Sequence, residues 1–170
     1  KVFRSPKGSL LVDMGQNMVG WIRLKAKGPR GTVITVRHAE VLDKYGEFYT
    51  ENLRAAKVKL TLTLAGTGED EIFEPRFTFM GFRYLEINGF PGTLTTDNIT
   101  GVVVHSEMEK SGTYESSNPL LNQLQHNIVW GQKGNFLDVP TDCPQRDERL
   151  GWTGDAQAFC RTAAFNFNVA

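Results

Sequence analysis

The chain changes its hydrophobic pattern near residue 110. Before that point, short segments alternate apolar and polar residues, and Ile22, Leu24 and Ala26 alternate with Arg23 and Lys25. Alternation of this kind places the apolar side chains on one face of a strand, which buries that face only. Further segments of the same type, separated by Gly or Pro, lie at 9–14, 32–39, 58–64, 72–80, 82–87 and 99–108. About seven strands in about 110 residues predict an antiparallel β-sandwich over residues 1–110.

After residue 111 the pattern becomes helical. Asn118 and Pro119 favour a helix start, because Asn caps free backbone N–H groups and Pro fits the first helical position. A second helical pattern begins near Asp155. The first helix would carry an apolar stripe made of Leu120, Leu121, Leu124 and Ile128 and would end at Gly131 or Gly134. The second would place Ala156, Phe159, Cys160, Ala163, Ala164 and Phe167 on one side.

Two helices of about fifteen residues cannot enclose a core of their own, yet both carry apolar stripes. We therefore expect residues 111–170 to be a linker and the incomplete beginning of a larger helical domain. The fold class expected for the whole chain is mainly β, with a sandwich followed by the first helices of a truncated domain.

Bulk charge and composition exclude several classes of partner. Lys plus Arg equal Asp plus Glu at 19 each, so no overall field favours nucleic acid or an anionic membrane. No apolar run approaches the ~20 residues of a membrane span. We expect neither nucleic acid nor membrane as a partner. Cys143 and Cys160 are too few for a disulfide framework and lack metal-site spacing, so we expect them to pack, and the cellular compartment stays unassigned.

The stretch DCPQRDERLGWTGDAQ, residues 142–157, is the densest cluster of chemistry-bearing side chains. Pro140 and Pro144 restrict its backbone, so the loop loses less entropy when it is ordered. A carboxyl group that donates a proton near neutral pH needs its charged form disfavoured by other carboxylates or by an aromatic ring. Around Glu148, the residues Asp142, Asp147, Asp155 and Trp152 would act in that direction, and Arg146 and Arg149 in the opposite one.

Two other interpretations of this stretch stay open on the residues alone. One is a solvated turn with salt bridges. The other is an acidic calcium loop, although Asp142, Asp147 and Asp155 lack the regular spacing of such loops. The three histidines, His38, His105 and His126, lie within strand or helix patterns and are expected to be structural.

Long segments of the chain resemble one enzyme family. DVPTDCPQRDERLGWTGDAQ is similar to the start of the catalytic domain of bacterial α-L-rhamnosidases, glycoside hydrolase family 78. GQNMVGWIRLKAKGPRGTVITVRHAEVLDKYGEFYTENLR and EPRFTFMGFRYLEINGF resemble the β-sandwich domain that precedes it there. The resemblance covers most of the chain from about Met14 onward. It implies an (α/α)6 barrel that removes terminal α-L-rhamnose with inversion, and residues 111–170 would be its truncated start.

The resemblance also implies roles for individual residues. Glu148 occupies the position of the general acid. Asp142, Arg146, Trp152 and Asp155 occupy positions that hold the sugar, while Asp147 and Arg149 would support them. It implies rhamnose-containing glycosides or polysaccharides as substrates, no cofactor and no metal.

An inverting enzyme also needs a second carboxylate as a base, which the family supplies from a later part of the barrel. We therefore expect the remaining catalytic domain of the parent chain as a partner. The 170 residues alone are expected to be inactive.

The alternative function is a carbohydrate-binding or scaffolding β-sandwich module. In that case Trp21, Tyr45, Phe48 and Tyr49 would form an exposed aromatic platform for sugar. Glycan titration separates the two hypotheses. Binding that is abolished by changing Trp21 or Tyr49 but unaffected by Glu148→Gln would favour the module.

Overall fold

The computed structural model describes residues 1–169, which divide into two compact units. The first unit comprises Lys1–Val103 together with the short segment Gln145–Asp147. The second begins at Val104, runs to Pro144 and resumes at Glu148. Among the described residues, no helix has the length and apolar character required to cross a membrane.

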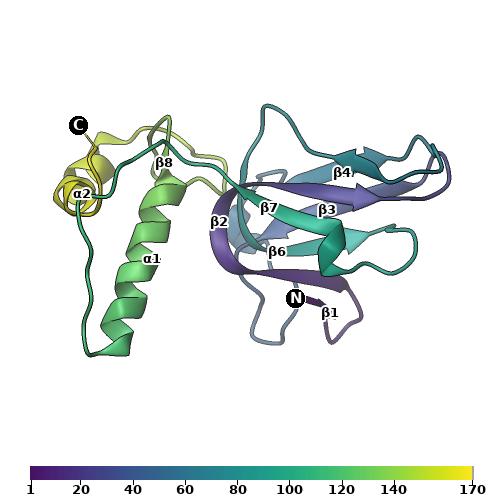
Figure 1. The fold of residues 1–170 in the computed structure, drawn as a ribbon, viewed down its shortest axis with the longest axis horizontal. Helices are drawn as coiled ribbons and strands as arrows, with labels where there is room; N and C mark the ends of the chain where they lie inside the picture. The colour runs from purple at the N-terminus through teal and green to yellow at the C-terminus, as the bar shows by residue number, and fades with distance from the viewer. Residues whose placement is uncertain (170) are drawn as a thin grey trace. The chain divides into compact units, whose positions relative to one another are not determined.

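The first unit is a seven-stranded antiparallel sheet. The strand order is β1-β2-β6-β3-β4, and both β5 and β7 pair with β2. Figure 1 shows β2 as a long, strongly curved ribbon that takes part in most of these pairings. The bounds are β1 Val2–Arg4, β2 Leu10–Ala26, β3 Val33–Ala39, β4 Lys59–Thr63, β5 Glu71–Phe73, β6 Met80–Asn88 and β7 Ile99–Val103. The predicted mainly antiparallel β architecture is confirmed.

The curve of β2 coincides with a break in its pairing. Its register against β6 shifts between Asp13 and Met18, and Gly15 lies there with a φ of 84°. A bulge of this kind bends a strand and increases its twist. The first part of β2 pairs with β1 and β6, whereas the part from Gly20 onward pairs with β7 and then β5. One strand thus joins two parts of the sheet.

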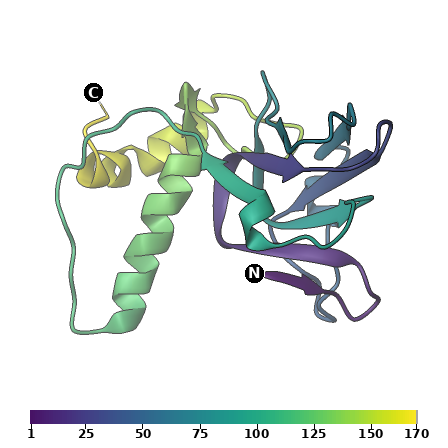
Figure 2. The ribbon, with the colours of Figure 1, turned by 45° about the vertical axis from the view of Figure 1, so that its right-hand side comes forward.

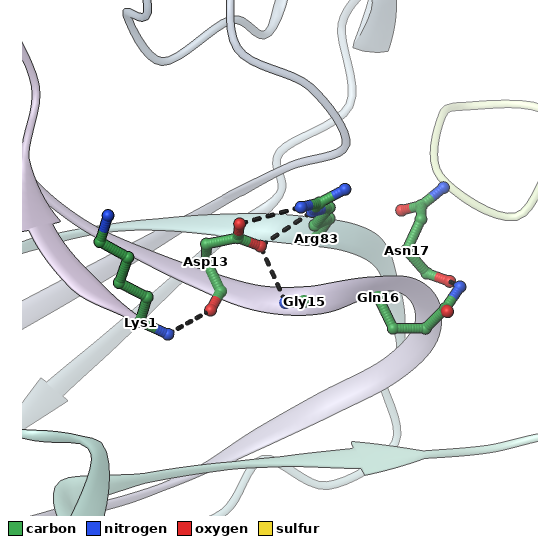
Figure 3. Close-up of polar contacts among 6 residues, drawn as sticks. All are labelled: Lys1, Asp13, Gly15, Gln16, Asn17 and Arg83. Carbon is green, nitrogen blue, oxygen red and sulfur yellow. Dashed lines mark hydrogen bonds and ion pairs between the residues drawn. The ribbon is translucent and has the colours of Figure 1, made fainter.

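An ion pair between neighbouring strands holds this bulge in place (Figure 3). Arg83 on β6 donates to both carboxylate oxygens of Asp13, at 2.8 and 2.9 Å. The same carboxylate accepts the N–H of Gly15 at 2.8 Å, and the amino terminus of Lys1 donates to the Asp13 carbonyl at 2.7 Å. The hydrogen bond from Arg83 is the main cause that lowers the pKa of Asp13 below its usual value.

The core lies on the faces predicted from alternation. Ile22 and Leu24 are fully buried and Ala26 is 1% exposed, which confirms the inward face predicted for this strand. Other side chains with no exposed surface are Leu11, Ile34, Phe82 and Leu85. Full burial of a Leu, Ile or Phe side chain contributes about 1.5–3 kcal/mol relative to exposure. These side chains therefore account for much of the driving force that folds the first unit.

Several predicted strand limits are wrong. The segments predicted at 9–14 and 22–26 belong to one strand, β2, because the bulge lets pairing continue across Gly15. The segment predicted at 72–80 forms a strand only over Glu71–Phe73. Pro75 has no N–H to donate, and Phe77 is fully exposed with a φ of 59°, so pairing stops there. The strand predicted to reach residue 108 ends at Val103, and β1 was not predicted.

The second unit contains two helices and a two-stranded hairpin. These are α1 Pro119–Asn135, β8 Phe136–Leu137, β9 Val139–Pro140 and α2 Thr153–Asn166. The predicted start of α1 is confirmed, since the Asn118 side chain accepts the Leu120 N–H at 3.0 Å. The predicted stop at Gly131 or Gly134 is wrong. A glycine typically ends a helix by adopting a positive φ, and neither residue does so.

Polar side chains take part in the packing of the two helices, and most of the predicted apolar stripe does not. The predicted stripe of α1 is largely exposed, with Leu120 at 76%, Leu121 at 42% and Leu124 at 53%. Two polar residues are buried, namely Gln132 on α1, 1% exposed, and Asn166 at the end of α2, 6% exposed. On the predicted apolar side of α2, Ala163 and Phe167 are buried, whereas Cys160 and Ala164 are exposed.

A chain of amide hydrogen bonds connects these helices, which Figure 2 shows from a second direction. Asn166 Nδ2 donates to Gln132 Oε1 at 3.0 Å, and Gln132 Nε2 donates to the Ala163 carbonyl at 3.1 Å. Gln125 Nε2 donates to Asn166 Oδ1 at 2.8 Å. Buried amides of this kind are stable only when they are paired. Here they fix α2 against the end of α1, from which the site loop continues.

Candidate active site

The charged stretch forms a loop that closes on itself at Asp142. The Asp142 N–H donates to the Leu150 carbonyl at 3.1 Å, and the Leu150 N–H donates to Asp142 Oδ1 at 3.1 Å. The Trp152 N–H donates to the same Leu150 carbonyl at 3.1 Å. Arg149 has a φ of 59°, a conformation that few non-glycine residues adopt. This backbone path returns the chain, with Glu148 on it, toward Asp142.

A buried thiol connects the two carboxyl groups. Cys143 Sγ lies 3.1 Å from Oδ2 of Asp142 and 3.1 Å from Oε2 of Glu148. Cys143 itself is 8% exposed. Its burial agrees with the packing role predicted for it, but its two polar contacts were not anticipated. The structure therefore brings together Asp142 and Glu148, which lie six positions apart in the sequence.

Asp142 is held in its ionised form. Burial is the largest single influence and raises the pKa of this carboxyl group. The hydrogen bonds that it accepts from the Cys143 thiol and from backbone N–H groups, including that of Leu150, together outweigh burial and leave the pKa below its usual value. Hydrogen bonds to the charged form favour that form.

Asp142 also faces a hollow of about 360 Å³ within the second unit. This volume is within the range of small-molecule sites. Asp155, on the first turn of α2, lines the same hollow, and the partial positive charge of a helix start stabilises a carboxylate there. The rest of the wall includes the rings of Phe136 and Phe159, whose centroids are 6.3 Å apart at 79°. The hollow thus combines two carboxylates with an apolar wall.

The two other predicted sugar-binding residues, Trp152 and Arg146, are not among the residues that line the hollow. Trp152 is the residue before α2, is 52% exposed and does not line the hollow. Arg146 lies in the segment Gln145–Asp147, which groups with the first unit. Within that unit the segment packs closely on β6, because a Cβ built on Gly81 would lie 2.6 Å from Gln145 Cβ.

Among residues 1–169, the structure brings one set of three potential metal ligands together. Asp142, Cys143 and Glu148 supply one thiol and two carboxylate ligand atoms, all within 4.8 Å of one another. These are the same three side chains that make the thiol contacts described above. The set does not match the calcium loop considered from the sequence, which would have used Asp147 and Asp155.

The aromatic platform expected for a sugar-binding module is not formed. Tyr45 is 69% exposed, but the other three side chains are partly buried. Trp21 donates its indole N–H to Glu74 at 2.7 Å. The Arg37 guanidinium lies over the Phe48 ring, 5.1 Å from its centroid. A single exposed tyrosine does not make an extended stacking surface for sugar rings.

Comparison with protein-family models matches the two parts of the chain to two consecutive domains. Residues 3–105 match the bacterial alpha-L-rhamnosidase concanavalin-like domain. Residues 109–170 match the bacterial alpha-L-rhamnosidase 6 hairpin glycosidase domain.

Individual relatives agree with these matches. The chain is 52% identical over 170 residues to an alpha-L-rhamnosidase of Streptomyces avermitilis, covering 100% of this chain and 16% of that protein. It is 48% identical over 161 residues to an alpha-L-rhamnosidase of Formosa agariphila, covering 94% of this chain and 17% of that one. The chain therefore spans less than a fifth of the length of these relatives.

Solved structures of similar proteins have the same fold over this region. Native alpha-L-rhamnosidase from Aspergillus terreus superposes with a TM-score of 0.94 at 50% identity, over 98% of this chain and 19% of that chain. The Streptomyces avermitilis alpha-L-rhamnosidase complexed with L-rhamnose also gives 0.94, at 52% identity, over 98% and 16%. A mainly antiparallel β unit followed by two helices is thus the common architecture. The chain belongs to the bacterial alpha-L-rhamnosidase family, and it corresponds to a fragment of a member of that family.

Proposed function

We propose that the protein containing this chain removes terminal α-L-rhamnose from glycosides, with inversion, and that Glu148 is its general acid. The observation that carries this proposal is the placement of Glu148 beside an ionised carboxylate, Asp142, which itself lines a hollow of sugar size. Relatives named alpha-L-rhamnosidase, one of them solved with L-rhamnose, support this choice of substrate.

The reaction requires a proton donor on one side of the sugar and a water molecule on the other. The Glu148 O–H bond breaks as its proton passes to the glycosidic oxygen, and that oxygen takes the electron pair of the bond to the sugar. A water molecule attacks the anomeric carbon from the opposite face and loses its proton to a second carboxylate, about 6.5–9.5 Å from the acid. We assign that base to a later part of the parent barrel, so the 170 residues alone are inactive.

The other predicted site residues would hold the sugar. Asp142 and Asp155 are suited to accept hydrogen bonds from sugar hydroxyls, and Arg146 to donate to them. Trp152 is exposed enough to cover the apolar face of a sugar ring. Asp147 and Arg149 are assigned supporting roles in the same loop. We assign residues 1–110 to the β-sandwich domain and 111–170 to a linker and the start of an (α/α)6 catalytic domain.

The test uses the full-length parent enzyme and an aryl α-L-rhamnoside. Proton NMR of the first-formed sugar should show the β anomer of rhamnose, as inversion requires. Glu148→Gln should lose activity, while Asp97→Asn, the loss of one exposed carboxylate in the first unit, should keep it. Measurable turnover by the pure 170-residue chain, or an α anomer as the first product, would overturn the proposal.

A further inference from the structure

A second hollow, of about 410 Å³, lies on the first unit at the paired strands β3 and β4. Its volume is within the range of small-molecule sites. Among the described residues that line it, four are basic and none is acidic, although the two kinds are equally frequent in the whole chain. We call it the basic hollow. Its cations are those of Arg37, Arg54, Lys57 and Lys59, and its hydroxyl groups are those of Thr50 and Thr61.

Two of these cations lie directly opposite each other in the sheet. Arg37 on β3 is the register partner of Lys59 on β4, and both side chains line the basic hollow. Like charges in this arrangement destabilise a pair of strands. On its other side, Arg37 lies opposite Glu86 on β6 and donates to it at 2.9 Å. The row across these three strands thus holds two cations and one acid, and an anion in the basic hollow would offset the remaining repulsion.

The protein itself holds Arg37 in place. Besides its bond to Glu86, Arg37 donates through Nη2 to Thr50 Oγ1 at 3.3 Å, and its guanidinium lies over the Phe48 ring. A side chain that is already fixed loses little conformational entropy when a ligand binds. Arg54 has a φ of 56° and a ψ of −123°, a strained conformation of the kind that proteins retain mainly at functional sites. The basic hollow is therefore organised before a ligand enters it.

We propose that the basic hollow binds an anionic sugar unit, which carries a carboxylate or sulfate group, within the glycan that the parent enzyme degrades. The choice of a glycan rests on the proposed function, whereas the anionic group follows from the four cations. Ammonium and guanidinium groups form charge-assisted hydrogen bonds to such oxygens. The hydroxyl groups of Thr50 and Thr61 are suited to the hydroxyls of the sugar. Within the described chain no aromatic side chain lines the hollow, so it offers no stacking surface to a nucleic-acid base.

The experiment measures the binding of charged oligosaccharides to the full-length parent enzyme by isothermal titration calorimetry. The probes are tetragalacturonate, which carries carboxylates, and sulfated maltotetraose, with unmodified maltotetraose as the uncharged control. None of them contains rhamnose, so binding does not report on the site of hydrolysis. We expect an anionic probe to bind, the neutral probe not to bind, and the affinity to fall as the salt concentration rises. The tighter of the two anionic probes identifies the charged group.

Paired lysine variants test the place of binding. Lys57→Gln with Lys59→Gln removes two exposed cations of the basic hollow and should weaken binding of the anionic probe about tenfold. The matched control is Lys7→Gln with Lys27→Gln, which removes two exposed cations elsewhere in the first unit and should keep the parent's affinity. If the first pair lowers the melting temperature, Lys57→Gln alone replaces it, because Lys57 lies outside the strands.

Three results would overturn the inference. One is that neither anionic probe binds. Another is that the control pair weakens binding as much as the hollow pair, since the attraction would then follow net charge alone. The third is that a DNA tetranucleotide binds as tightly through the same lysines. Turnover of an aryl α-L-rhamnoside tests the proposed function separately. If the parent hydrolyses it and binds neither probe, only this inference fails, and if it binds a probe through these lysines without hydrolysis, only the proposed function fails.

Discussion

A buried histidine in the first unit should make the stability of the chain depend on pH. His38 on β3 has no exposed surface and packs edge-on against Phe82, with ring centroids 4.8 Å apart. Its Nδ1 lies 3.1 Å from the Val58 carbonyl, so this nitrogen carries the hydrogen. Within residues 1–169, Nε2 has no hydrogen-bond partner. A proton on Nε2 would therefore be a buried, unpaired charge.

The size of the effect follows from the two pKa values. Burial lowers the pKa of His38 to about 4, although the hydrogen bond to the Val58 carbonyl opposes this. In the unfolded chain the value is about 6.5. Below pH 6.5 the unfolded state binds a proton that the folded state does not. The part of the free energy of unfolding that depends on His38 is therefore at its maximum above about pH 6.5. It falls as the pH drops toward 4 and levels off below that. Linkage gives a loss of about 2 kcal/mol between pH 7 and pH 5.

The assay is urea unfolding of the 170-residue chain at pH 7 and pH 5, followed by far-UV circular dichroism. In His38→Asn, which cannot take up a proton, this 2 kcal/mol component of the pH dependence should disappear, whatever the variant's stability at pH 7. His126→Asn is the matched control, because His126 is exposed on α1, and it should keep the pH dependence of the unsubstituted chain. If His38→Asn loses as much stability as the unsubstituted chain between the two pH values, the reasoning is refuted.

Three further predictions concern the contacts that shape the two units. Gln132→Leu should destabilise the second unit by about 2 kcal/mol, because it removes the acceptor of the Asn166 side-chain N–H and one of the two donors to the Ala163 carbonyl, and unchanged amide exchange in the helices would contradict this. Asp13→Asn should cost about 1 kcal/mol at pH 7, a modest figure because Arg83 is 39% exposed. Since the pKa of Asp13 is lowered, this difference should vanish in thermal melts as the pH falls through that pKa. Gly81→Ala should speed amide exchange in Gln145–Asp147, which the new methyl group would displace, and unaltered exchange there would count against the close packing described.

Local patterns predicted much of the fold. Alternation identified the inward faces of the strands because a side chain's direction depends only on its neighbours along the strand. Alternation could not predict that β2 is one continuous strand. Its bulge is held by Asp13 and Arg83, which are 70 positions apart, and no local rule connects them.

For the helices, the sequence predicted the start of α1 but not the side chains through which the two helices pack. The capping signal of Asn118 and Pro119 is local, and it was correct. The apolar stripe of α1 predicts the packing face, but within the described chain the buried hydrogen bond between the helices joins Gln132 and Asn166. Amides are common on solvated faces, so nothing in the sequence marks these two as buried partners. Only the direction of α2 relative to α1 brings them together.

The candidate site was located by resemblance and by its density of charged residues. The sequence did not show that Asp142 and Glu148 approach each other, because a spacing of six residues in a loop does not fix a distance. Their closeness depends on the backbone hydrogen bonds between Asp142 and Leu150. The position of Cys143 next to Asp142 was the available signal, and it was interpreted as packing alone.

The most direct test of the central claim is the leaving-group dependence of Glu148→Gln in the full-length parent enzyme. A general acid matters most when the departing oxygen is strongly basic, and its removal typically costs 10²–10⁴-fold in rate. We expect a loss of about that size in kcat on an alkyl α-L-rhamnoside. On a dinitrophenyl α-L-rhamnoside we expect little loss, because the dinitrophenolate leaving group departs without protonation. Equal rates for the variant and the parent on the alkyl substrate would contradict the assignment of Glu148 as the acid.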